Sequence, residues 1–191
     1  MNAARKNLVG LEAVACIPGT VGGAVVMNAG SDEGTTSDLL VRVEVVTSAG
    51  RRRVFMKNEL SFGYRHSLFQ GAEWLILSAD FRMRHGDGTM AAEAIEAKIE
   101  ERMRRYPMEF ANAGSVFKRP KGDYAGRLIE LSGCKGLRVG DAMVSERHAN
   151  FIVNLGNATA ADILGLISEV QKRVFEKTNV LLEPEQIWLG D

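Results

Sequence analysis

One amphipathic segment, residues 89–106, most constrains how this sequence can fold. The segment is dense in Ala, Glu, Lys and Arg, and Ile95, Ile99 and Met103 recur at every fourth position. That spacing places the three side chains in one apolar stripe of a helix. Pro107 follows, and because proline lacks the amide hydrogen that a helix needs, it ends the helix there. We therefore expect a long helix between two separately folded parts of the chain.

Strand and helix patterns lie on both sides of this segment. Apolar residues alternate with others along residues 41–46, which is the period of a strand buried on one face. A turn at 47–50 and a returning strand at 54–56 predict a hairpin. The other expected elements are strands at 75–81, 151–153 and 180–182, and a helix at 160–177 that begins with the capping pair Thr159 and Asp162.

The order of these elements indicates the fold class. Strands and helices do not alternate regularly along the chain, which favours an α+β fold over a doubly wound sheet. We expect three regions: a first lobe at residues 1–84, a linking helix segment at 85–106 and a second lobe at 107–191.

Composition and charge restrict the class of function. Apolar residues make up 46% of the 191 residues, as is usual for a folded globular domain. The 24 basic and 24 acidic residues balance, which argues against nucleic acid as a partner because phosphate binding needs an excess of Lys and Arg. No apolar run approaches the roughly 20 residues of a membrane span. The two cysteines and three histidines show no metal-ligand spacing, so we expect no metal site and a reducing, cytoplasmic location.

Three glycines within five residues make the segment 17–24 a candidate ligand site. Glycine lets the backbone approach a ligand closely and present N–H groups to an anion. Asn28 and Gly30 follow, and they add a side-chain amide and another permissive backbone position. The spacing matches neither a P-loop nor the dinucleotide fingerprint Gly-x-Gly-x-x-Gly, so a tight structural turn is an equal alternative.

Three further segments carry candidate chemistry. Tyr64 and Arg65 lie in the segment 62–67, where a guanidinium beside an aromatic ring can grip a planar anion; the alternative is a surface Arg beside a packed Tyr. Ser115 follows a glycine, and its hydroxyl is either a proton donor or part of a turn. Glu185 lies near the end of the chain, where a carboxyl is usually solvated but acts as an acid if it closes over a pocket.

In this order, the segments resemble one enzyme family, the UDP-N-acetylenolpyruvoylglucosamine reductases. The resemblance covers nearly the whole chain, and four separated motifs in family order are far more specific than any one of them. The matching segments are Gly10-Leu11-Glu12, Ile17–Gly23, Asn28-Ala29-Gly30, Phe62–Ser67, Ala113–Lys118, Lys135-Gly136, Val144–Phe151 and Leu182–Glu185.

The resemblance implies an oxidoreductase that uses FAD and NADPH to reduce a UDP-sugar enolpyruvyl ether to UDP-N-acetylmuramate for peptidoglycan. It also implies that the chain comprises the C-terminal part of a FAD-binding domain and then a UDP-sugar-binding domain. Carried over by position, Ser115 protonates the substrate, while Arg65 and Glu185 stabilise the enol-like intermediate. The positions implied in substrate binding are Tyr64, Lys118 and Arg119. The positions implied in FAD binding are Pro18, Gly19, Thr20, Gly22, Gly23, Asn28 and Gly30.

The sequence departs from the family pattern at four places, one of which is Arg119, where the family often has Asn. Residues 1–8 lack the Gly-rich segment with which the family's FAD site begins, so we expect a C-terminal portion of such an enzyme. The segment 31–34 replaces the usual Ala-Tyr-Gly, and Gln186-Ile187 replaces an aliphatic residue followed by Arg. Two alternatives follow: a UDP-sugar-binding module without catalysis, or a related flavoprotein with another substrate. Apolar surface left by an absent segment would favour association with a partner.

Overall fold

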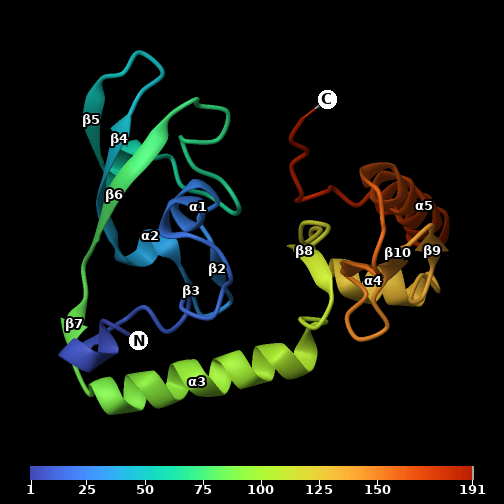
Figure 1. Ribbon diagram of the computed structural model, residues 1–191, viewed down its shortest axis with the longest axis horizontal. Coiled ribbons are helices and arrows are strands. Elements are labelled where there is room, and N and C mark those ends of the chain that lie inside the picture. The colour runs from blue at the N-terminus through green and yellow to red at the C-terminus, as the bar shows by residue number, and fades with distance from the viewer. Residues whose placement is uncertain (191) are drawn as a thin grey trace. The chain divides into compact units, whose positions relative to one another are not determined.

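The computed structural model describes residues 1–190, which form two compact units. Unit 1 comprises Met1–Glu100 and unit 2 comprises the described residues from Glu101 onward, so the division falls inside the long helix α3, Gly88–Arg105. Figure 1 shows both units and this helix, and each unit is described below by itself. Along residues 1–190, no helix is both long and apolar enough to cross a membrane.

Unit 1 is built on a three-stranded antiparallel sheet with the order β5-β4-β6. The strands are β4 (Leu40–Val46), β5 (Arg52–Met56) and β6 (Leu75–Phe81), so the expected hairpin and the expected strand at 75–81 are both confirmed. Successive side chains of β4 point to opposite faces of the sheet, which explains why Val43 and Val45 are fully buried while Glu44 between them is not. The core of unit 1 comprises Val25, Leu40, Val43, Val45, Phe55, Leu60 and Phe69.

Short elements surround this sheet. Helix α1 packs against β6, and the short strand β1 pairs with β7. The short strands are β1 (Leu8–Val9), β2 (Gly30–Ser31), β3 (Gly34–Thr35) and β7 (Arg84–His85). The short helices are η1 (Ala4–Lys6), α1 (Val21–Val26), α2 (Thr36–Leu39) and η2 (Lys57–Glu59).

Helix α3 lies within one residue of the predicted bounds. The Asp87 carboxylate accepts hydrogen bonds from the backbone N–H groups of Thr89 and Met90, at 2.9 and 3.1 Å, which starts the helix. The predicted apolar stripe is only partly buried. Ile95 is 5% exposed, whereas Ile99 and Met103 are 40% and 61% exposed.

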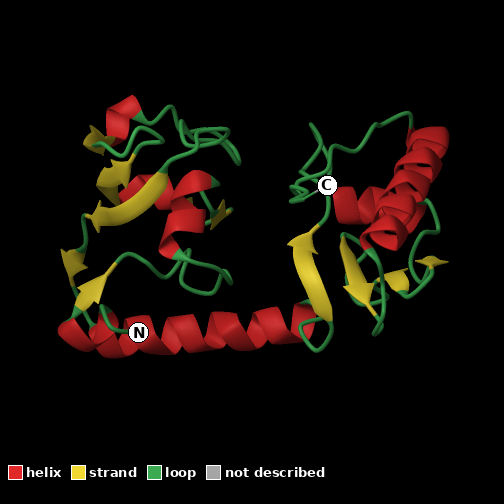
Figure 2. Ribbon diagram, turned by 45° about the horizontal axis from the view of Figure 1, so that its top comes forward, coloured by secondary structure: helices red, strands yellow, loops and turns green. Residues whose placement is uncertain are grey.

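Unit 2 is a four-stranded antiparallel sheet with two helices packed on one face (Figure 2). The order is β8 (Ala111–Ser115), β11 (Phe151–Asn154), β10 (Ala142–Val144) and β9 (Arg138–Val139). Helices α4 (Ala125–Leu131) and α5 (Ala160–Thr178) bury their apolar sides against it. The mixture of sheets and helices in both units confirms the α+β fold class.

Helix α5 follows its sequence signals closely. Thr159 Oγ1 accepts from the Asp162 backbone N–H at 3.1 Å, and the Asp162 carboxylate accepts from the Thr159 N–H at 2.9 Å, which is the expected capping box. The helix ends at Asn179, whose φ of 57° is left-handed. The expected strand at 180–182 is wrong. The Leu182 carbonyl accepts from the Gln171 side chain at 2.8 Å, so a side chain takes the place of a strand partner.

Candidate active site

The glycine-rich segment begins helix α1. Thr20 is the residue that caps the helix, and its Oγ1 accepts a hydrogen bond from the Gly23 N–H at 3.0 Å. Gly22 and Gly23 therefore lie in the first helical turn, while Pro18, Gly19 and Thr20 are an exposed approach to it. The tight structural turn considered above does not describe the whole segment, because a helix begins within it.

Packing within the described chain does not explain the glycines of this helix. A Cβ on Gly23 would meet the Thr20 Oγ1 at 3.4 Å, and a Cβ on Gly22 would meet its nearest neighbours at 3.9 Å, which are ordinary contacts. Glycine in a helix costs about 1 kcal/mol relative to alanine. The space left open here fits a ligand that approaches the backbone closely. Gly30 differs, because its Cβ would lie 2.5 Å from the Gly34 carbonyl oxygen, so the β2–β3 hairpin itself requires a glycine.

Asn28 connects the glycine-rich segment to the Tyr-Arg segment. It is buried and has a φ of 43°. Its Nδ2 donates to the Gly63 carbonyl at 3.0 Å, and its Oδ1 accepts from the Ser37 N–H at 3.0 Å. The fully buried Ser67 donates to the Val26 carbonyl at 2.7 Å, which adds a second link. Hydrogen bonds from Asn28 and Ser67 thus join two segments that the sequence suggested separately.

Tyr64 and Arg65 lie at the tip of a tight turn. Gly63 and His66 close that turn through two backbone hydrogen bonds of 3.1 and 3.3 Å. The Arg65 guanidinium lies over the Tyr64 ring, 5.1 Å from its centroid. Arg65 has a φ of 51°, a conformation that costs a non-glycine residue energy and that clusters at functional sites. Gln70 supports it, because its Nε2 donates to the Arg65 carbonyl at 2.8 Å.

Ser115 and Glu185 come close together in unit 2. Ser115 is the exposed last residue of β8, and the next two residues are buried. The Glu185 N–H donates to the Val116 carbonyl at 2.7 Å, and the Lys118 N–H donates to the Glu183 carbonyl at 2.9 Å. The segment around Glu185 therefore pairs with the segment that follows Ser115, although about 70 residues separate them in the sequence.

Basic side chains follow Ser115 along the chain. Lys118 forms an ion pair with Glu183, and the Arg119 guanidinium lies 4.3 Å from the centroid of the Tyr124 ring. The Asp123 carboxylate accepts from Arg127 Nε at 2.7 Å, and this bond, with one from the Tyr124 N–H, lowers the pKa of Asp123 to about 2. Asp123 thus stays ionised beside the cations of this loop, and the predicted phosphate-binding residues lie on a structured segment.

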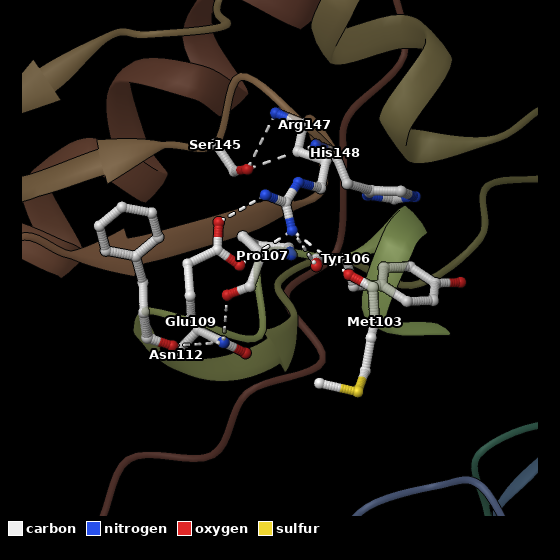
Figure 3. A network of polar contacts seen from close by, with 9 residues as sticks. Met103, Tyr106, Pro107, Glu109, Asn112, Ser145, Arg147 and His148 are labelled. Atoms are coloured by element: carbon white, nitrogen blue, oxygen red, sulfur yellow. Dashed lines mark hydrogen bonds and ion pairs between the residues drawn. The ribbon is translucent and has the colours of Figure 1, made fainter. Parts of the chain in front are cut away.

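A polar network holds the base of the strand that carries Ser115 (Figure 3). The Arg147 guanidinium makes hydrogen bonds of 2.9 and 2.6 Å to the two carboxylate oxygens of Glu109, and one of 2.9 Å to the Tyr106 carbonyl, which caps the end of α3. Asn112 Oδ1 accepts from the Gly114 N–H at 3.0 Å, directly before Ser115. Reasoning from the sequence missed these roles, although Arg147 lies in a segment that matched the family.

His148 belongs to the same region. Its ring lies 5.0 Å from that of Tyr106 and 5.2 Å from that of Phe151, measured between centroids. Burial lowers the pKa of His148, and the nearby Arg105 lowers it further. The neutral ring can accept a hydrogen bond, and its Nδ1 accepts from the Asn150 N–H at 3.3 Å.

The predicted site residues therefore fall into two sets. In unit 1, hydrogen bonds join the glycine-rich segment to the turn that carries Tyr64 and Arg65. In unit 2, backbone pairing joins residues 116–118, which directly follow Ser115, to the segment that ends at Glu185. Within residues 1–190, no three His, Cys, Asp or Glu side chains gather as a metal site would require.

Comparisons with known proteins place this architecture in a class. Residues 2–55 match a FAD-binding domain, and residues 106–189 match the C-terminal domain of UDP-N-acetylenolpyruvoylglucosamine reductase. The chain thus has the organisation of a flavin-binding reductase with a second domain specific to one enzyme family.

Individual relatives identify that family. The UDP-N-acetylenolpyruvoylglucosamine reductase of Moorella thermoacetica is 48% identical over 187 residues, which are 97% of this chain and 62% of the relative. A reductase of the same description from Symbiobacterium thermophilum is 44% identical over 97% of this chain and 61% of its own length. The crystal structure of the Thermus caldophilus enzyme superposes with a TM-score of 0.86 at 41% identity, covering 98% of this chain and 67% of that one. The chain belongs to the UDP-N-acetylenolpyruvoylglucosamine reductase family, as the sequence motifs predicted, and it spans about three-fifths of the length of these curated relatives.

Proposed function

We propose that this chain takes part in the NADPH-dependent reduction of UDP-N-acetylglucosamine enolpyruvate to UDP-N-acetylmuramate, a step in the synthesis of peptidoglycan precursors. The observation that carries the proposal is the backbone pairing of residues 116–118, which directly follow Ser115, with the segment 183–185 that ends at Glu185, in a chain of this family. The pairing holds the residues that carry the Ser115 hydroxyl and the Glu185 carboxyl in fixed positions relative to each other, as acid catalysis requires.

The proposal includes FAD as the cofactor. The residues present fit the group, because the backbone at Gly19, Gly22 and Gly23 is open to a close approach that a Cβ would hinder. Pro18 and Thr20 are exposed beside it, and Asn28 and Gly30 shape the segment that follows. When bound, FAD supplies hydride transfer with NADPH as the source of electrons.

The residues of the chain supply the proton and the electrostatic stabilisation. Reduction of the enolpyruvyl double bond needs a hydride at the methylene carbon and a proton at the carbon that bears the carboxylate. The exposed Ser115 hydroxyl donates that proton. The Arg65 guanidinium and the Glu185 carboxyl stabilise the negative charge that develops on the substrate carboxylate before the proton arrives.

Binding of the UDP-sugar falls to three further residues. Lys118 and Arg119 follow Ser115 directly, and their cations suit the two phosphates of UDP. Tyr64 presents an exposed ring beside Arg65. A cytoplasmic location without nucleic-acid partners is part of the proposal, and the two free cysteines and the balanced charge support it.

A second candidate is a UDP-sugar-binding module without catalysis. The observation that favours it is that unit 2 has a hydrophobic core of its own and contains Ser115, Lys118, Arg119 and Glu185. The two candidates differ in whether NADPH is consumed.

Turnover separates these candidates. The purified chain is incubated with FAD, NADPH and UDP-N-acetylglucosamine enolpyruvate, and both NADPH loss and UDP-N-acetylmuramate are measured. We expect product, and Ser115→Ala should lower the rate about 100- to 10,000-fold without loss of bound FAD, because a general acid contributes that much. Ser168→Ala, an exposed serine of α5, is the control and should turn over normally. Substrate binding without product would favour the second candidate.

A further inference from the structure

Asn150 makes an unusual pair of hydrogen bonds in unit 2. Its side chain is buried, and its residue is 7% exposed. Its Oδ1 accepts from the Phe117 N–H at 3.0 Å, and its Nδ2 donates to the Phe117 carbonyl at 2.9 Å. One side-chain amide thus satisfies both backbone groups of a residue that lies 33 positions away and is itself 2% exposed.

The path of the chain explains why a side chain is needed at this point. Strands β8 and β11 pair up to Ser115 and Phe151, and the Val116 N–H then donates to the Asn150 carbonyl at 2.9 Å. Before Phe151 the chain turns, because the Phe151 N–H bonds to the His148 carbonyl at 3.0 Å. No backbone from this turn bonds to Phe117 among the described residues. The Asn150 amide therefore extends the strand pairing by one residue.

The other side of the same segment contacts the end of the chain. The Lys118 N–H donates to the Glu183 carbonyl, and the Glu185 N–H donates to the Val116 carbonyl. The segment 116–118 is thus held between Asn150 on one side and the segment 183–185 on the other. Without the amide, the buried N–H and C=O of Phe117 lose their partners, and a buried polar group without a partner is costly enough to shift the backbone.

We propose that Asn150 is a positioning residue that sets Ser115 and Glu185 in register for the protonation of the substrate. This inference rests on the proposed function for its catalytic consequence, whereas its structural part stands on the geometry of unit 2 alone. Asn150 touches Phe117 rather than the reacting groups, so it acts through the backbone that connects them.

Amide hydrogen exchange tests the structural part without any turnover. In Asn150→Ala, exchange at the Phe117 and Glu185 amides should be about tenfold faster than in the parent chain, because their hydrogen bonds open more often. Asn154→Ala is the matched control, since Asn154 Oδ1 accepts from the Gly156 and Ala158 N–H groups at 2.8 and 2.9 Å. The control should speed exchange at those two amides and leave Phe117 unchanged. Unchanged exchange at Phe117 in Asn150→Ala would overturn the inference.

Rapid kinetics test the catalytic consequence in the FAD-loaded chain. Asn150→Ala should slow reduction of the UDP-sugar about 100-fold, as misplacement of a catalytic group does, and leave reduction of the flavin by NADPH unchanged. Equal slowing of both steps would indicate general damage to the fold and would overturn the positioning role. If the parent chain itself shows no turnover, the proposed function fails, and the exchange result alone decides whether Asn150 holds the segment.

A conservative variant keeps the test decisive if Asn150→Ala does not fold. Asn150→Asp retains the oxygen that accepts from the Phe117 N–H but replaces the donor to the Phe117 carbonyl with a second oxygen. The Phe117 amide should then remain protected, while the Glu185 amide exchanges faster than in the parent chain. Protection at Glu185 equal to that of the parent would contradict the inference.

Discussion

The Gly23→Ala substitution is expected to raise the stability of the chain and lower its affinity for FAD. Gly23 lies in the first turn of α1, its φ is not left-handed, and an added Cβ would have the Thr20 Oγ1 as its nearest described neighbour, at 3.4 Å. Alanine gains about 1 kcal/mol over glycine in a helix, and half of that, about 0.5 kcal/mol, is the value expected for a terminal turn. For a chain of this length, that gain raises the unfolding midpoint by roughly 1–2 °C.

In the proposed FAD site, the same methyl group occupies the space through which the cofactor approaches the backbone. We expect FAD affinity to fall at least about tenfold, which is roughly 1.4 kcal/mol. Thermal unfolding without FAD measures the first effect, and quenching of flavin fluorescence on titration with protein measures the second. Gly165→Ala is the control, because Gly165 lies in α5 and its Cβ would make an ordinary contact of 3.5 Å with Val139.

The control should gain stability similarly and bind FAD as the parent does. A Gly23→Ala chain that is less stable than the parent would refute the reasoning about space around α1. A Gly23→Ala chain that is more stable and binds FAD with unchanged affinity would refute the claim that the glycine serves the cofactor.

Three further predictions follow from individual contacts. Gln70→Ala removes the donor to the Arg65 carbonyl, so turnover should fall about tenfold. The free energy of unfolding should fall by only about 1 kcal/mol, as the loss of one hydrogen bond does. Normal turnover in this variant would refute a supporting role for Gln70. Burial lowers the pKa of His148 below 6.5, so the folded chain favours the neutral ring. The free energy of unfolding should therefore fall as the pH drops below about 6.5, where the unfolded chain takes up a proton at this residue. Denaturant titrations across pH should show that His148→Gln loses this part of the pH dependence of stability. The pKa of Asp123 should be about 2 by carboxyl NMR and rise toward 3.8 in Arg127→Gln, with the stabilising contribution lost as the pH falls toward 2.

Local patterns predicted the long elements of the fold. Helices α3 and α5 and the strand β6 were found within a residue of their expected bounds; the two helices have a clear apolar period, and α5 has a capping box. Strand β8 was not expected, since its sequence Ala-Asn-Ala-Gly-Ser lacks the branched and aromatic residues typical of strands. Its pairing with β11 imposes the conformation, and such pairing leaves no trace in the sequence of β8 alone.

The sequence suggested which residues carry the chemistry, but not which residues support them in the fold. Motifs located Ser115 and Glu185, whose backbone neighbours do pair. Asn150 was overlooked because its two bonds go to the backbone of Phe117, and a backbone partner can be of any residue type. The sequence also did not reveal that both ends of the Asn28 amide bond to backbone groups, of Gly63 and of Ser37; its expected part in FAD binding stays a prediction.

Calorimetric titration of UDP-N-acetylglucosamine enolpyruvate into the chain, with and without FAD, tests the central claim most directly. The account predicts binding to the FAD-loaded chain, weakened strongly in a Lys118→Ala/Arg119→Ala double variant and unchanged in Lys172→Ala, an exposed control on α5. Absence of binding under both conditions would contradict the claim that this chain holds a UDP-sugar site.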